Sequence, residues 1–201
     1  MKEHHLTAEE IEAGLAHLLQ APRAETVLDL IVRRPADGER EVLEVGQLDL
    51  DLGLVGDNWS VRGSSKTADG CAHPGMQLNL MGSRVIALLS GRMTGHERWP
   101  LAGDQLFMDL DTSPGNLPPG TRLAIGDAVI EITDVPHAGC DKFVVRFGVE
   151  AMRLVSSELG KAHNLRGVNA RVVCSGVVRR GDRVVRVGRA ADGARQAFGT
   201  D

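Results

Sequence analysis

A β-hairpin followed by a cysteine-bearing loop is predicted from one stretch of the sequence, Gly120-Thr-Arg-Leu-Ala-Ile-Gly-Asp-Ala-Val-Ile-Glu-Ile-Thr-Asp-Val-Pro-His-Ala-Gly-Cys-Asp-Lys-Phe143. Strand-type apolar residues lie on both sides of Gly126-Asp127, a pair that is typical of a tight turn. A proline and a glycine then restrict and bend the backbone ahead of Cys140. We therefore expect a rigid hairpin that presents Cys140 for chemistry, with Lys142 close enough to hold a thiolate.

The rest of the chain predicts many short strands and few helices. A capping-box pattern, Thr7-Ala-Glu-Glu10, predicts a helix through about Leu19. A short helix or turn is predicted at 83–89, and helical spacing recurs at 148–159. Period-two spacing or β-branched runs predict strands at 27–32, 41–45, 76–80, 105–110, 170–173, 176–178 and 182–187. This pattern predicts a mainly β fold, a mixed barrel with a few peripheral helices.

One domain with short extensions fits the length of 201 residues and the hydrophobic share of 42%. We expect a helical extension at 1–24, the barrel at 25–188 and a disordered tail at 189–201. The long polar loop 57–75 is expected to be functional and to lie beside the cysteine loop, so that the two form one pocket.

Composition disfavours several classes of partner. The net charge is −4, no block of Lys and Arg occurs, and aromatic residues make up 3% of the chain, which together argue against nucleic-acid binding. No charged-then-apolar leader and no run of about 18 apolar residues is present, so we expect no membrane partner. Three cysteines in such a chain indicate a reducing, cytoplasmic setting in which Cys140 is a free thiol.

A series of motifs, in this order along the chain, resembles MOSC domains, named after the C-terminal domain of molybdenum cofactor sulfurases. The resemblance covers roughly residues 27–187. It rests on Gly53-Leu-Val-Gly-Asp57, Met76-Gln-Leu-Asn-Leu80, Gly103-Asp-Gln-Leu106, Leu117-Pro-Pro-Gly-Thr-Arg-Leu-Ala-Ile-Gly-Asp127, His137-Ala-Gly-Cys-Asp-Lys-Phe143, Arg166-Gly-Val-Asn-Ala-Arg-Val172 and Gly181-Asp182.

The resemblance implies a β-barrel with a functional cysteine at Cys140. In family members this cysteine is proposed to carry sulfur as a persulfide, or it ligates molybdenum in reductases that act on N-hydroxylated compounds. Cys140 and His137 are accordingly the catalytic candidates, with Cys140 also the metal ligand. His137 could tune the thiol or donate a proton, or it could only stabilise its loop through a hydrogen bond.

Ten residues are candidates for holding an anionic molybdenum cofactor. Many family members have a basic residue where this chain has Asn58, and Arg62 or Lys66 could supply the missing charge. Simpler structural roles are open for Asp57 as a turn-closing side chain and for Arg166 and Arg171 as members of internal ion pairs. The full set is Asp57, Asn58, Arg62, Lys66, Asn79, Asp104, Lys142, Arg146, Arg166 and Arg171.

Partners follow from the two functional alternatives. A reductase needs a small-molecule substrate and separate electron-transfer proteins, because the chain has no iron–sulfur cysteine set and no dinucleotide fingerprint. A sulfur carrier needs a sulfur donor protein. Pyridoxal phosphate is not expected, since the resemblance places it in the sulfurase portion that this chain lacks.

A zinc site is the competing interpretation. Cys71, His73, His137 and Cys140 together make two Cys and two His, the ligand set of a structural zinc site. The chain would then be a zinc-stabilised structural or binding module without catalysis.

Overall fold

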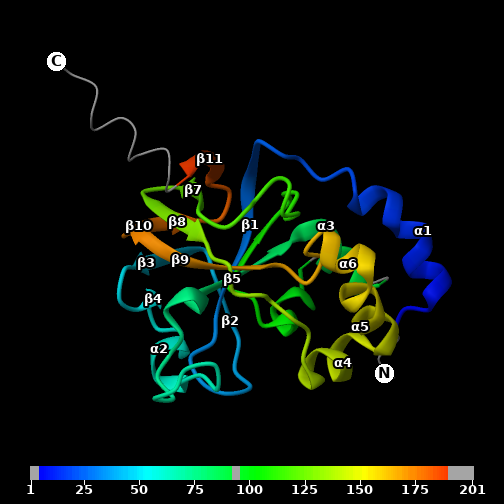
Figure 1. Cartoon of the computed structure of the whole chain (residues 1–201), viewed down its shortest axis with the longest axis horizontal. Coiled ribbons are helices and arrows are strands. Elements are labelled where there is room, and N and C mark those ends of the chain that lie inside the picture. Colours follow the sequence, from blue (N-terminus) through cyan, green and yellow to red (C-terminus); the bar gives the residue numbers. More distant parts are fainter. Residues whose placement is uncertain (1–4, 92–95, 190–201) are drawn as a thin grey trace.

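A closed β-barrel forms the centre of the computed structural model, which describes residues 5–91 and 96–189 (Figure 1). Within these residues seven strands close the barrel, because β11 pairs with β1 as well as with β7. All neighbours are antiparallel except β5 and β6, which are parallel. Around the barrel the order is β1 (Glu25–Arg33), β6 (Leu106–Met108), β5 (Leu78–Gly82), β9 (Val168–Cys174), β8 (Ala128–Ile132), β7 (Thr121–Ile125) and β11 (Arg183–Arg189). The predicted mainly β barrel is confirmed.

The hairpin ahead of the cysteine loop forms as predicted. Strands β7 and β8 pair in register from Arg122 opposite Glu131 to Ile125 opposite Ala128, with the turn at Gly126-Asp127. Gly126 has a φ of 53°, and an added Cβ would approach Asp182 and the backbone of Val177 closely. Only glycine fits this turn, because both the left-handed backbone and the close approach exclude a side chain.

The single strand predicted at 41–45 is wrong. Glu44 separates β2 (Glu41–Leu43), which extends the barrel sheet beside β1, from β3 (Val45–Asp49), which joins β4 (Gly53–Leu54) and β10 (Gly176–Arg179) in a second sheet. Local strand propensity is the same on both sides of Glu44. The break exists because the two halves pair with strands that lie far apart in the sequence.

Two hydrophobic clusters explain why some strands are apolar on both faces. Residues such as Leu28 and Leu80 point into the barrel, whereas Leu30 and Phe107 point outward against the helices. Strands β1, β5 and β6 are therefore covered on both sides, as their nearly continuous apolar sequences require.

The helices lie mostly on one side of the barrel (Figure 1). The predicted N-terminal helix is confirmed as α1 (Ala8–Leu18), including the Thr7–Glu10 capping box. The helix predicted at 148–159 is divided in two by Ser157, which caps the second part. A helix directly after Cys140 was not expected. The remaining helices are α2 (Trp59–Arg62), η1 (Pro74–Met76), α3 (Ser83–Leu89), η2 (Trp99–Ala102), α4 (Asp141–Phe147), α5 (Val149–Ser156) and α6 (Glu158–Ala162).

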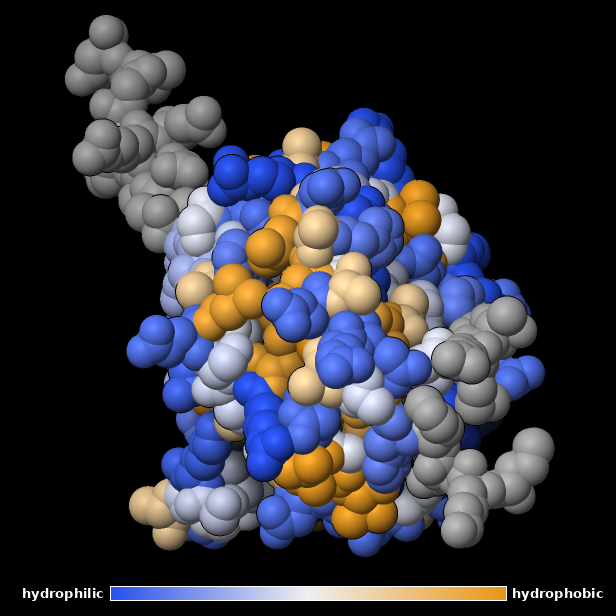
Figure 2. Space-filling model, turned by 90° about the vertical axis from the view of Figure 1, so that its right-hand side faces the viewer, coloured by the Kyte–Doolittle hydropathy of each residue, from blue (hydrophilic) through white to orange (hydrophobic). Residues whose placement is uncertain are grey.

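The helix-covered side carries apolar side chains interspersed with hydrophilic ones (Figure 2). Among the described residues, no helix is long and apolar enough to cross a bilayer. The predicted tail at 189–201 lies, after Arg189, outside the described residues.

One region of the barrel wall gathers the segments that carry the candidate residues. The backbone of Gln105, ahead of β6, bonds to Val32 of β1 and to Asn79 of β5. Asn79 lies opposite Asn169 of β9, whose carbonyl oxygen accepts from the amide of Thr133 after β8. The loop after β8 leads to Cys140 and α4 in this same region.

Candidate functional site

A cavity of about 330 Å³ lies over this region of the barrel wall, and Cys140 is part of the cavity wall. Its size is in the range of small-molecule and cofactor sites. Arg62 lines the same cavity, and Lys66 Nζ lies 3.4 Å from the carbonyl oxygen of Pro136. The prediction that the 57–75 loop and the cysteine loop form one pocket is thereby confirmed.

The cavity floor contains a buried ion pair between Arg34 and Asp57. Both side chains are almost fully buried, and the Arg34 guanidinium donates to both Asp57 carboxylate oxygens at 2.8 Å. Asp57 also accepts from the backbone amides of Arg34 and Trp59. Asp57 thus anchors the start of the 57–75 loop to the end of β1, and its charge is neutralised by Arg34.

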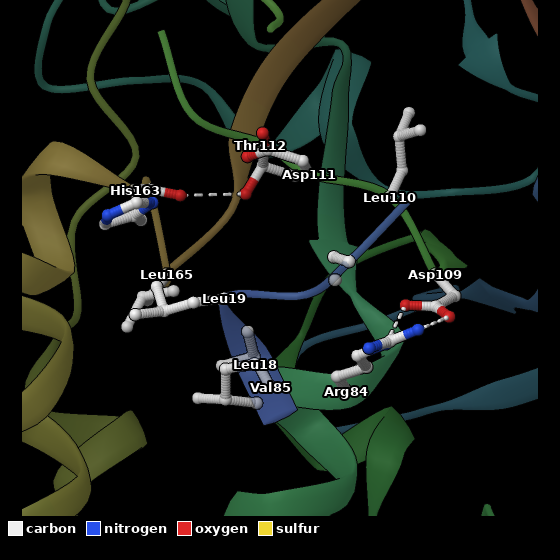
Figure 3. Close-up of a pocket in the computed structure, with 12 residues that line it drawn as sticks. Leu18, Leu19, Arg84, Val85, Asp109, Leu110, Asp111, Thr112, His163 and Leu165 are labelled. Atoms are coloured by element: carbon white, nitrogen blue, oxygen red, sulfur yellow. Dashed lines mark hydrogen bonds and ion pairs between the residues drawn. The ribbon is translucent and has the colours of Figure 1, made fainter. Parts of the chain in front are cut away.

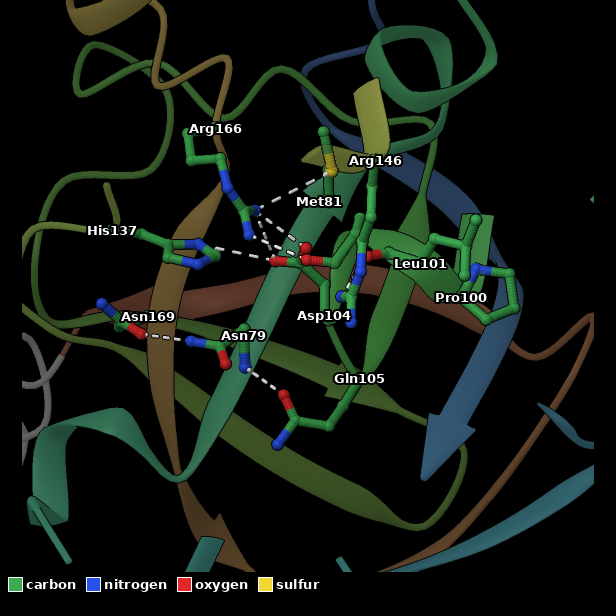
Figure 4. Close-up of polar contacts among 12 residues, drawn as sticks. Asn79, Met81, Pro100, Leu101, Asp104, Gln105, His137, Arg146, Arg166 and Asn169 are labelled. Atoms are coloured by element: carbon green, nitrogen blue, oxygen red, sulfur yellow. Dashed lines mark hydrogen bonds and ion pairs between the residues drawn. The ribbon is translucent and has the colours of Figure 1, made fainter. Parts of the chain in front are cut away.

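A second buried group joins Arg166, Asp104 and His137 (Figure 4). Arg166 Nη1 donates to the two Asp104 oxygens at 3.0 and 2.8 Å, and its guanidinium carbon lies 4.8 Å from the centre of the Phe143 ring. Burial raises the pKa of the Asp104 carboxyl, although the charge and hydrogen bonds of Arg166 oppose this. Burial is also the main cause that holds the pKa of His137 well below its ordinary value of 6.5, so the imidazole is neutral at pH 7.

The cavity rim differs from the floor because its cations lack buried carboxylate partners. Arg40 and Arg146 donate to the carbonyl oxygens of Pro100 and Leu101, and Arg62 makes no hydrogen bond or ion pair with another described residue. Burial, followed by the charges of nearby arginines, lowers the pKa values of Arg40 and Arg62 from the ordinary value of a guanidinium. An anion bound here would relieve this crowding of like charges.

Cys140 lies at the mouth of this cationic cavity as an exposed free thiol. It precedes α4, where its carbonyl oxygen accepts from the amides of Phe143 and Val144. Lys142 also lines the cavity, but its ammonium pairs with the exposed carboxylate of Asp37 at 2.7 Å. The side chain of Lys142 is therefore directed toward the β1–β2 loop.

The structure brings most of the candidate cofactor contacts together but separates Arg171 from them. Asn58, Arg62, Asn79, Lys142, Arg146 and Arg166 line the cavity, together with His137 and Cys140. Arg171 instead pairs with Glu131 at 2.7 Å and borders a different groove with His73. It takes the internal ion pair that was its alternative role.

The zinc interpretation finds no ligand set in the structure. In residues 5–91 and 96–189, no group of three or more His, Cys, Asp or Glu side chains is placed to hold a metal ion. Cys71 is exposed, and its pKa is raised mainly by a hydrogen bond to Asp69.

The sequence-based interpretation did not identify two residues of the site, Arg34 and Arg40. They flank the Pro-Ala-Asp-Gly-Glu loop between β1 and β2, which folds over the cavity and contributes Ala36 and Asp37 to its wall. The signal that could have found them is an arginine at each end of a turn-forming loop.

A smaller hollow beside the end of α1 is a packing contact rather than a site (Figure 3). Its volume is about 20 Å³, close to that of one water molecule. Its charged groups satisfy one another, since Arg84 donates to both carboxylate oxygens of Asp109.

Comparison with known proteins finds a family match for part of the chain that lines this cavity. Residues 103–185 match the family model described as the MOSC domain. The matched part includes Asp104, His137, Cys140, Lys142 and Arg166, whereas Asp57 and Arg62 lie upstream of it. Some members of the MOSC domain family are associated with molybdenum cofactor.

Solved structures share the fold of this chain. The YuaD protein from Bacillus subtilis superposes with a TM-score of 0.61 at 13% identity, over 85% of this chain and 100% of that one. YiiM from Escherichia coli gives a TM-score of 0.53 at 20% identity, over 82% and 71% of the two chains. At these identities the likeness concerns the fold. No curated protein matches the sequence.

Proposed function

We propose that this MOSC domain binds a phosphate-bearing molybdenum cofactor in the Cys140 cavity and uses the Cys140 thiolate as a metal ligand. The observation that carries the proposal is an exposed thiol beside three arginines, Arg40, Arg62 and Arg146, around one cavity; among the described residues these arginines have no carboxylate partner. Thiolate is a soft ligand suited to a soft metal centre, and guanidinium groups match phosphate oxygens.

Unsatisfied polar atoms at the cavity support a polar ligand. Asn58 Oδ1 and Arg166 Nε are buried and have no hydrogen-bond partner in residues 5–91 and 96–189, and both side chains line the cavity. Buried polar atoms of this kind normally have partners, so a ligand that supplies them fits the cavity. Asn58 would accept a hydrogen bond from such a ligand and Arg166 would donate one.

A bound molybdenum centre supplies two-electron chemistry, and the proposed reaction is the reduction of N-hydroxylated or related small molecules. The chain's own residues bind the phosphate, ligate the metal and shape the cavity. Electrons are assigned to a separate transfer protein, since three cysteines cannot form a four-cysteine iron–sulfur site.

Metal and phosphorus analysis of protein expressed in a host that makes molybdenum cofactor tests this proposal. Wild type should retain molybdenum, and Cys140→Ser should lose it while keeping the wild-type unfolding curve. Cys174→Ser is the matched control, because Cys174 is also an exposed thiol but lies at the end of β9 outside the cavity. Wild type without molybdenum would count against the cofactor.

A second candidate function, sulfur transfer, is favoured by the exposure of Cys140. The Cys140 thiolate attacks the terminal sulfur of a persulfide on a donor protein, a new S–S bond forms at Cys140, and the donor leaves as its thiolate. Metal-free wild type whose mass shows one added sulfur atom on Cys140 would support this function over the first.

A further inference from the structure

His137 is a shared wall between the Cys140 cavity and a second cavity. The second cavity, of about 280 Å³, lies on another side of the ring, and its wall includes Leu117, Val135 and Asn164. A group that borders two cavities can exchange protons with solvent in one while a ligand occupies the other. Among the described residues that line the Cys140 cavity, no other residue also lines the second cavity.

The ring lies close both to Asp104 and to Gly167. His137 Nδ1 is buried and has no hydrogen-bond partner within the part of the chain that the structure describes, and Asp104 Oδ1 lies 3.5 Å away (Figure 4). Gly167 has a φ of 100°, and a Cβ there would meet Leu80 O at 2.1 Å and His137 Nδ1 at 3.3 Å. A side chain at this position would clash with the backbone of Leu80 and crowd the ring. Catalytic hydrogen bonds often lengthen to this degree when no ligand is bound.

Four charged groups face the ring from four segments of the chain. Arg34 at the end of β1, Lys66 in the 57–75 loop and Arg166 ahead of β9 are cationic, and Asp104 ahead of β6 is the acidic group. The three cations disfavour an imidazolium, so a proton can reach Nε2 at low cost only if Nδ1 releases one. Asp104 is positioned to accept it.

We infer that His137 and Asp104 form the proton-transfer pair of the Cys140 cavity, with solvent access to the ring through the second cavity. A hydronium ion gives its proton to His137 Nε2 as the Nδ1 proton passes to Asp104 Oδ1. On delivery, Nε2 gives a proton to a ligand atom and Asp104 returns its proton to Nδ1. No electrons move in these steps. The inference rests on the proposed function only for the ligand that receives the proton.

Histidine ring NMR tests the pair without any ligand. In protein labelled with ¹⁵N-histidine, His137→Gln identifies the signals of His137 by their loss. We expect the wild-type ring to stay neutral well below pH 6.5 and Asp104→Asn to change its tautomer ratio. A ring that titrates near 6.5 and is unaffected by Asp104→Asn would overturn the pair. If the Asp104→Asn variant does not fold, the pH titration of the His137 ring in the wild-type protein alone tests the pair.

Hydrogen–deuterium exchange at the His137 ring carbon tests the access route. The Cys140 cavity is blocked with N-ethylmaleimide in a Cys71→Ser, Cys174→Ser background, which leaves Cys140 as the target. Exchange should continue after this block and slow several-fold when Val135→Trp also fills the second cavity. The proposed solvent access through the second cavity would be overturned if exchange stops after alkylation alone, or if Val135→Trp does not change the exchange rate. Neither measurement depends on molybdenum, so failure here is distinct from failure of the proposed function.

Discussion

Arginines lie on both the floor and the rim of the cavity, but the two groups differ in whether an aspartate neutralises their charge. On the floor, Arg34 and Arg166 are buried and each is neutralised by an aspartate, Asp57 and Asp104. On the rim, Arg40, Arg62 and Arg146 contact carbonyl oxygens or nothing in the described chain. The paired arginines stabilise this part of the barrel, whereas the rim arginines, which have no carboxylate partner among the described residues, are available to bind an anion. Removing a charge from each region should therefore give different results.

Removal of the floor charge should cause the largest effect on folding. Asp57→Asn leaves the buried Arg34 guanidinium without its counterion, which costs about 3–5 kcal/mol when one partner of a buried pair is lost. Denaturant unfolding measures this loss. The control is Asp37→Asn on the rim, whose exposed pair with Lys142 should contribute almost nothing. Equal free energies of unfolding for the two variants would contradict the view that the floor pairs stabilise the fold and the rim pair does not.

Removal of a rim charge should affect binding and leave folding intact. Arg62→Ala should weaken binding of inorganic pyrophosphate by about tenfold, the loss of one charge-assisted contact. The free energy of unfolding should be unchanged or higher, because Arg62 is crowded by Arg34. Calorimetric titration checks this result. Arg171→Ala, outside the cavity, should bind as wild type does, and a loss there equal to that of Arg62→Ala would contradict the assignment.

The reactivity of Cys140 should sharpen the same contrast. Iodoacetamide at neutral pH should label Cys140 several-fold faster than Cys71, because cations surround the first thiol and the hydrogen bond to Asp69 raises the pKa of the second. Cys174 should also lag behind Cys140. Peptide mass spectrometry gives the three rates, and equal labelling would argue against a functional thiol in this cavity.

The smallest expected effect is a pH dependence of stability at His137. Below pH 6.5 the unfolded chain protonates this histidine, whereas the folded chain keeps it neutral. The unfolded state then binds more protons, so the free energy of unfolding falls as the pH drops through and below 6.5. His137→Gln should lack this part of the decline. Urea unfolding of both proteins from about pH 7.5 to pH 5.5 measures the difference, and parallel curves would show that the folded ring titrates normally.

Local sequence signals were sufficient for the hairpin and for the first helix. Gly126-Asp127 has the backbone freedom that a tight turn needs, and Thr7 and Glu10 supply both bonds of a capping box. The helix α4 was missed because Val144 and Val145 are β-branched and disfavour a helix locally. Tertiary packing decides in its favour, since Phe143 and Phe147, four residues apart, both enter the outer core. That spacing was the available signal.

Long-range pairing limited how much of the site could be predicted from the sequence. The length and polarity of the 57–75 loop were enough to predict a common pocket for Arg62, Lys66 and Cys140. The partners of the floor arginines could not be predicted in the same way, because Arg34 and Asp57 are 23 residues apart and Asp104 and Arg166 are 62 apart. Only closure of the barrel determines which charges are neutralised and which remain for a ligand.

An anomalous-scattering map at the molybdenum edge, from crystals of protein loaded in a cofactor-producing host, is the most direct test of the central claim. The account predicts a molybdenum peak at bonding distance from Cys140 Sγ and phosphate density against Arg40, Arg62 and Arg146. A peak elsewhere, or density in the cavity that makes no contact with Cys140, would contradict it.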